Sequence, residues 1–154
     1  MLIKGSCHCR NISFALRCEA DPKNVPARAC TCSFCTKHGA VWTALCSASL
    51  EVSVRERAHL SRYTFDSNTA QFHICARCGV VPLAISSIEG RLYAVVNSKT
   101  FEDFDFSQLQ HVPVSFDGES ERERLARRKR YWIANVEYPD SGALAVLSPE
   151  RGDE

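Results

Sequence analysis

The cysteines constrain this chain more than any other feature, since 154 residues contain nine of them. Seven stand in three tight clusters, which are Cys7-His8-Cys9, Cys30-Thr31-Cys32-Ser33-Phe34-Cys35 and Cys75-Ala76-Arg77-Cys78. Such short spacings are typical of thiolates that ligate a metal. A disulfide framework is the alternative, and the odd number of cysteines argues against it.

The apolar segments and the net charge of the sequence indicate the cellular compartment and the kinds of partner to expect. The N-terminal residues MLIKGSCHCR contain no long apolar segment, and no stretch reaches the ~20 apolar residues needed to span a bilayer. We therefore expect a cytoplasmic protein, in a compartment where structural disulfides are rare. The formal net charge is +1, so no strong field recruits nucleic acid or a membrane surface, and we expect neither as a partner.

The hydrophobic pattern predicts a mainly β fold in a single domain over residues 1–137, followed by a C-terminal tail over 138–154. Apolar residues alternate with polar or small ones at 12–16, 50–54, 72–74 and 81–85, which is the period of half-buried strands. The apolar run 92–96 predicts a buried strand. One segment predicts a helix, from Ser120 to about Trp132, because Ser120 and Glu123 form the sequence pattern of a capping box.

Two cysteine pairs far apart in sequence predict a structural zinc site. Structural zinc takes four protein ligands in a tetrahedron, commonly from two short pairs. Cys7 and Cys9 with Cys75 and Cys78 fit that arrangement, and Gly79 allows a sharp turn after the second pair. A zinc there would tie the first strand to the middle of the sheet and contribute to folding.

The middle cluster predicts a second zinc of a different kind. Cys30, Cys32 and Cys35 can converge on one ion but leave its fourth position unfilled, which is the pattern of a catalytic zinc. The alternative is a fourth protein ligand, for which the candidates are Cys18, Cys46, His8, His38 and His73, with His38 the best placed. We expect Cys18 and Cys46 in or near the core, as small apolar residues.

The predicted helix carries a basic run, since residues 119–130 contain six lysines or arginines against three glutamates. We expect a solvated face there, with attraction of a carboxylate-bearing substrate or a phosphate backbone as the alternative. Trp42, Tyr131 and Trp132 are expected in the core or in the wall of a pocket.

The cysteine motifs, read with their neighbours, resemble a known family. Gly5-Ser6-Cys7-His8-Cys9, the segment from Cys30 to Ala40, and Cys75-Ala76-Arg77-Cys78-Gly79 are similar to the glutathione-dependent formaldehyde-activating enzyme family, which includes centromere protein V. The resemblance covers roughly residues 2–101. It implies a β-tent of small antiparallel sheets with zinc knuckles, in which the split-pair zinc is structural and the three-cysteine zinc lies at the active site.

The resemblance also implies an activity. The family joins a thiol to formaldehyde reversibly, giving S-hydroxymethylglutathione, and in the reverse direction this is a carbon–sulfur lyase. The expected partners are a small-molecule thiol, glutathione being favoured, and a small carbonyl. The expected cofactors are two zinc ions per chain. The alternative function is a zinc-stabilised binding module in which both zincs are structural and nothing is catalysed.

Overall fold

The computed structural model describes residues 1–139, which form two β-sheets and two α-helices. The first sheet has the order β10 (Phe101–Glu102), β1 (Leu2–Ser6), β2 (Ile12–Arg17), β5 (Ser49–Val54), β12 (Asn135–Glu137). The second has the order β11 (His111–Val114), β3 (Ala27–Cys30), β4 (Trp42–Thr43), β9 (Arg91–Asn97), β8 (Leu83–Ile88), β7 (Gln71–Cys75), β6 (Leu60–Tyr63). Residues 140–154 of the expected tail lie outside the described residues.

The predicted mainly β class with a C-terminal helix is confirmed, but the sheets are mixed. Most neighbouring strands pair antiparallel, whereas β11 lies parallel to β3 and β12 lies parallel to β5. The sheets expected to be antiparallel are therefore mostly so, with one parallel pairing in each. These two strands come late in the chain and return to the edges of strands formed much earlier, which permits a parallel pairing.

The alternating pattern at 12–16 and 50–54 forms the centre of the first sheet. β2 and β5 pair antiparallel with Phe14 opposite Val52 and Leu16 opposite Leu50, and all four side chains are buried. Period-2 alternation puts these residues on one face of the sheet. That face joins one hydrophobic core with buried residues of β8 and β9, such as Leu83 and Val96.

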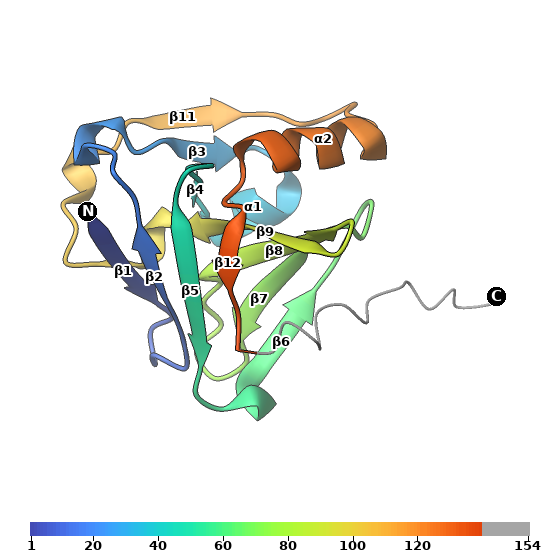
Figure 1. Ribbon diagram of the computed structural model, residues 1–154. Helices are drawn as coiled ribbons and strands as arrows, with labels where there is room; N and C mark the ends of the chain where they lie inside the picture. The colour runs from blue at the N-terminus through green and yellow to red at the C-terminus, as the bar shows by residue number, and fades with distance from the viewer. Residues whose placement is uncertain (140–154) are drawn as a thin grey trace.

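Helix α2 (Glu121–Tyr131) begins where the sequence predicts. Ser120 accepts a hydrogen bond from the Glu123 backbone N–H, and the Glu123 carboxylate accepts one from the Ser120 N–H, which completes the capping box. In Figure 1, α2 lies at the same end of the molecule as β3, β11 and the short helix α1 (Ser33–His38). No helix among residues 1–139 is long and apolar enough to cross a membrane.

Candidate metal centres and the cavity beside them

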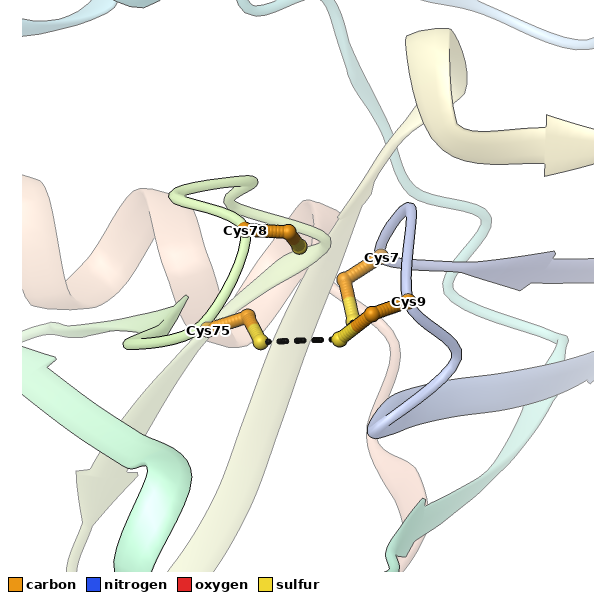
Figure 2. A group of neighbouring side chains, drawn as sticks. All are labelled: Cys7, Cys9, Cys75 and Cys78. Atoms are coloured by element: carbon orange, nitrogen blue, oxygen red, sulfur yellow. Dashed lines mark hydrogen bonds between the residues drawn. The ribbon is translucent and has the colours of Figure 1, made fainter.

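The four cysteines of the split pairs meet between the two sheets. Cys7 and Cys9 lie in the turn from β1 to β2, and Cys75 and Cys78 lie where β7 turns toward β8. Their Sγ atoms all lie within 4.8 Å of one another. Figure 2 shows the four side chains pointing toward one another from two facing loops. The cluster therefore joins the first sheet to the second.

Each of these loops is closed by backbone hydrogen bonds that aim its sulfurs inward. In the first, the Cys7 N–H bonds the Ile12 carbonyl at 2.8 Å, and the Ile12 N–H donates to the Cys7 Sγ at 3.3 Å. In the second, the Gly79 N–H bonds the Cys75 carbonyl at 2.7 Å. Gly79 has φ of 74°, a left-handed conformation that glycine adopts without strain.

The thiols of this cluster interact too closely to behave independently. Burial raises the pKa of Cys7 to about 12 and also raises the pKa of Cys75. Burial acts in the same direction on Cys78, but the backbone N–H groups of Cys9 and Val80, together with neighbouring thiols, lower the pKa of Cys78 to about 6. Four sulfurs this close carry several negative charges only when a cation neutralises them.

The second cluster forms where β3 ends and α1 begins. The Sγ atoms of Cys30, Cys32 and Cys35 lie within 4.8 Å of one another. Cys30 ends β3, while Cys32 caps α1 by accepting the Cys35 N–H at 3.5 Å. α1 ends at His38 and is capped by Gly39, whose left-handed φ of 61° lets the chain leave the helix. One tight loop thus brings three thiols together.

One indole stabilises charge on this cluster. The Nε1–H of Trp42 donates to the Cys35 Sγ at 3.2 Å. The hydrogen bond between Cys30 and Cys35 is the main influence on both thiols: it lowers the pKa of Cys30 to about 6 and raises the pKa of Cys35. Cys30 is therefore the first thiol of the pair to ionise.

Within residues 1–139, no fourth histidine, cysteine or carboxylate joins the three-cysteine group. His38 is exposed, and its ring lies 4.6 Å from that of Phe34. His73 is buried, and its Nε2 lies 3.1 Å from the hydroxyl of Tyr138. Cys18 is buried as expected. Cys46 is exposed, so its expected core position is wrong; it lies in a turn closed by the Ala48 N–H on the Leu45 carbonyl.

The donor sets fit zinc. A tetrahedron of sulfurs at about 2.3 Å from zinc has edges of about 3.8 Å. The Sγ atom of Cys9 lies 3.7 Å from that of Cys7 and 3.4 Å from that of Cys75, distances too long for a disulfide and close to those edges. The four-cysteine cluster can hold one ion completely. The three-cysteine cluster can hold an ion with one position to spare.

The three-cysteine cluster lies in the wall of a cavity of about 340 Å³. This volume falls in the range of pockets for small molecules. Two kinds of side chain line much of the remaining wall. The aromatic ones are Trp42, Phe65, Phe72, Phe116, Tyr131 and Trp132, and the arginines are Arg28, Arg124, Arg127 and Arg128. The expectation that Trp42, Tyr131 and Trp132 lie in core or pocket wall is confirmed.

Three arginines of α2 turn one face of this helix toward the cavity. Arg124, Arg127 and Arg128 are spaced three to four residues apart, so they share a face. This corrects the expectation of a solvated basic face for these three side chains. Sequence reasoning counted the charge but did not place it beside the cysteines. The helical spacing was the signal that could have done so.

A mainly β protein with two cysteine clusters that could each hold a metal ion, one of them in the wall of a cavity, is the class that this geometry defines. The sequence profile of the glutathione-dependent formaldehyde-activating enzyme family matches residues 2–114, and the chain belongs to that family. The matched residues include all seven clustered cysteines and end before α2. A crystal structure of a Rhodobacter sphaeroides protein, a structural genomics target, is 29% identical and aligns with a TM-score of 0.53. The alignment covers 71% of this chain and 97% of that one. No curated protein matches.

Proposed function

We propose that this protein is a zinc-dependent enzyme of the carbon–sulfur lyase type, which activates a thiol for reversible addition to formaldehyde or another small carbonyl. Cys30, Cys32 and Cys35 would hold the catalytic zinc. Cys7, Cys9, Cys75 and Cys78 would hold a structural zinc. The observation that carries the proposal is that the three-cysteine group, with no fourth protein ligand among the described residues, lies in a cavity of about 340 Å³.

The proposed reaction needs no oxidant and no further reactant. Cys30, Cys32 and Cys35 would hold the zinc, which would lower the pKa of a bound thiol so that it is held as a thiolate near neutral pH. The thiol sulfur forms a bond to the carbonyl carbon, and the π electrons of the C=O bond move to the oxygen. The proton that left the thiol ends on this oxygen, giving R–S–CH2–OH from R–SH and formaldehyde. The reverse steps constitute the lyase reaction.

The protein's own residues contribute position and environment. The Trp42 N–H stabilises negative charge on the Cys35 sulfur, as outer ligand contacts of metal sites commonly do. The ring of Trp42 packs edge-on against Phe72 at 5.7 Å, which fixes the indole beside the cluster. Apolar walls of this kind exclude water and strengthen electrostatic interactions inside the cavity.

Glutathione is the thiol that the family description favours, and formaldehyde is the corresponding carbonyl. The nine cysteines are all free thiols, which suits a reducing compartment such as the cytoplasm. We treat residues 1–137 as one domain in this proposal, because the four-cysteine cluster joins its two sheets.

The proposal is tested by the rate at which the zinc-loaded protein equilibrates glutathione and formaldehyde with their adduct, measured by NMR exchange spectroscopy. The parent protein should accelerate exchange, and Cys32→Ser should abolish the acceleration. Cys46→Ser is the matched control, because Cys46 is exposed and outside both clusters. Exchange no faster than in buffer, with glutathione and with smaller thiols alike, would sink the proposal.

A further inference from the structure

Arg128 is a buried arginine on the cavity wall, and among residues 1–139 it has no acidic partner. The residue is only 7% exposed. Its Nη1 donates to the Thr69 hydroxyl at 2.7 Å and to the Ser86 hydroxyl at 3.3 Å. Its Nε is buried and makes no hydrogen bond. An arginine offers five N–H donors, so a good part of this guanidinium's capacity is unused.

Unlike Arg128, the neighbouring cavity arginines of α2, Arg124 and Arg127, are paired with carboxylates. Arg127 holds Glu119 in a two-point contact, with Nε–Oε1 of 2.8 Å and Nη2–Oε2 of 3.0 Å. Arg124 pairs with Asp66 through a short contact and lies 3.6 Å from Glu119. Within residues 1–139, neither Arg128 nor Arg28 has a carboxylate within ion-pair distance.

Burying a cation without a counter-ion costs folding free energy, so other contacts or a bound anion should offset that cost. The guanidinium lies 4.9 Å from the centre of the Trp132 ring, which offsets a part of the cost. Burial lowers the pKa of Arg128 to about 10, which still leaves it charged at neutral pH. Two aspartates, Asp66 and Asp117, also line the cavity, but Asp66 is engaged by Arg124 and Asp117 is exposed.

The rest of the wall indicates what kind of anion fits. Six aromatic residues border the cavity together with small apolar ones such as Ala70, Ala84 and Val95. An aromatic and aliphatic wall suits an apolar body, whereas the guanidinium suits a planar carboxylate, which it can bind through two parallel hydrogen bonds. The arginines of α2 lie beyond the residues that the family profile matches.

We propose that the cavity takes an organic acid with an apolar or aromatic body, whose carboxylate binds Arg128 while its other end reaches Cys30, Cys32 and Cys35. This inference deepens the proposed function and rests on it for the identity of the reaction, since the acid is one of the two reactants. Either the thiol or the carbonyl compound carries the carboxylate. Arg28, which also has no carboxylate within ion-pair distance in the described part of the chain, lines the same cavity and would face the same ligand.

Binding can be measured without turnover, because both tryptophans of the chain, Trp42 and Trp132, line the cavity. Intrinsic fluorescence of the zinc-loaded protein is titrated with phenylacetate, with 2-phenylethanol as the neutral analogue and with acetate as the carboxylate without a body. Phenylacetate should bind at least about tenfold more tightly than either, because a hydrogen bond to a charged group in a buried site is strong.

Variants assign the effect to one side chain. Arg128→Gln should weaken phenylacetate at least about tenfold and leave 2-phenylethanol unchanged. Arg128→Lys keeps the charge but loses the two-point geometry, so its affinity for phenylacetate should lie between those of the parent and of Arg128→Gln. This variant replaces Arg128→Gln in the test if the glutamine variant does not fold. Arg122→Gln is the matched control, on the same helix but exposed and outside the cavity wall. Circular dichroism melts show which variants are folded.

The source of the carboxylate is found with reactants. Two reactant pairs are compared: 4-mercaptophenylacetate with formaldehyde, in which the thiol carries the carboxylate, and a small thiol with 4-formylphenylacetate, in which the carbonyl compound carries it. Arg128→Gln should raise the KM of the carboxylate-bearing reactant in only one of these pairs. That pair shows which reactant binds Arg128 in the productive complex. Equal binding of phenylacetate and 2-phenylethanol to the parent, or undiminished phenylacetate binding to a folded Arg128→Gln, overturns the inference. If phenylacetate binding depends on Arg128 but the protein catalyses no addition of a thiol to a carbonyl, the inference holds and the proposed function is wrong. If the protein catalyses that addition and Arg128→Gln changes neither binding nor KM, the proposed function holds and the inference is wrong.

Discussion

The indole Nε1 of Trp42 lies 3.2 Å from the Sγ of Cys35 and donates a hydrogen bond to it, which links the aromatic wall of the cavity to the three-cysteine cluster. Trp42 belongs to β4, and β4 pairs with both β3 and β9. The hydrogen bond is therefore held by the sheet rather than by the loop that carries the cysteines. A mutation at Trp42 can alter the cluster without moving its ligands.

Trp42→Phe should weaken metal binding at the three-cysteine cluster about tenfold, because contacts to metal ligands commonly contribute 10- to 100-fold in affinity. The phenyl ring preserves most of the packing against Phe72. Competition with a graded series of chelators measures the affinity. Trp132→Phe lines the same cavity without a hydrogen bond to a cysteine and should leave the affinity unchanged. Equal affinities for parent and Trp42→Phe would contradict this role of the indole.

Cys75→Ser should destabilise the whole protein. A structural zinc site can contribute on the order of 10 kcal/mol to folding, and this one joins two sheets. Each kcal/mol lost lowers the melting temperature by about 2–4 °C at this chain length, so a decrease of at least ~10 °C is expected. Thermal unfolding followed by circular dichroism measures it, with Cys46→Ser as the control. If Cys75→Ser melts within a few degrees of the parent, Cys75 is no structural ligand.

Cys32→Ser should leave the fold largely intact and remove one of two zinc ions. Its cluster is formed by one local loop, and the four-cysteine cluster retains all its ligands. Metal analysis after gel filtration should give one zinc per chain for the variant and two for the parent, with closely similar far-UV spectra. Unfolding as severe as that of Cys75→Ser would mean that the middle cluster is structural too.

Glu119 should make a pH-dependent contribution to the free energy of unfolding. The hydrogen bonds from Arg127, followed by the charges of Arg127 and Arg124, hold the pKa of Glu119 below its ordinary value. Because the folded-state pKa is depressed, the stabilisation is fully present above the unfolded-state pKa of about 4.5 and is lost as pH falls through the folded value.

Glu119→Gln should therefore cost about 1 kcal/mol at pH 7, as for a well-aligned and largely covered ion pair. The difference in unfolding free energy between parent and variant should shrink toward zero below about pH 4.5. Protonation of the cysteine ligands affects both proteins alike and cancels in this difference. Urea titrations at several pH values measure it, and a difference that grows on acidification would refute the assignment.

The sequence predicted the parts of this protein that depend on local patterns. The strands around Phe14 and Val52 follow from period-2 alternation, and α2 follows from Ser120 and Glu123. The spacing of the cysteines also separated the two groups correctly, because ligand pairs that lie two or three residues apart can reach one ion only from a tight turn.

What the sequence missed depends on long-range contacts. Helix α1 is too short for a periodic pattern, and its ends are marked only by Cys32 and Gly39. Cys46 follows an apolar run, but the strand there stops at Thr43, and Cys46 lies in an exposed turn at residues 46–47. Contacts between distant segments decide the parallel pairings of β11 with β3 and of β12 with β5. They also decide the position of Arg128 in the cavity wall, and no local pattern records such contacts.

A zinc held by Cys30, Cys32 and Cys35 would keep one coordination position for an external thiol, and calorimetry can detect a thiol that binds there. Glutathione or a smaller thiol is titrated into the fully zinc-loaded protein in buffers of different ionisation enthalpy, which counts the protons released. Near neutral pH the release should approach one proton per thiol bound, and it should decrease as pH rises toward the thiol's own pKa of about 8.5. Cys32→Ser should show neither the heat nor the protons. If the two-zinc protein gives neither heat nor proton release with any thiol, the three-cysteine zinc does not bind an external thiol.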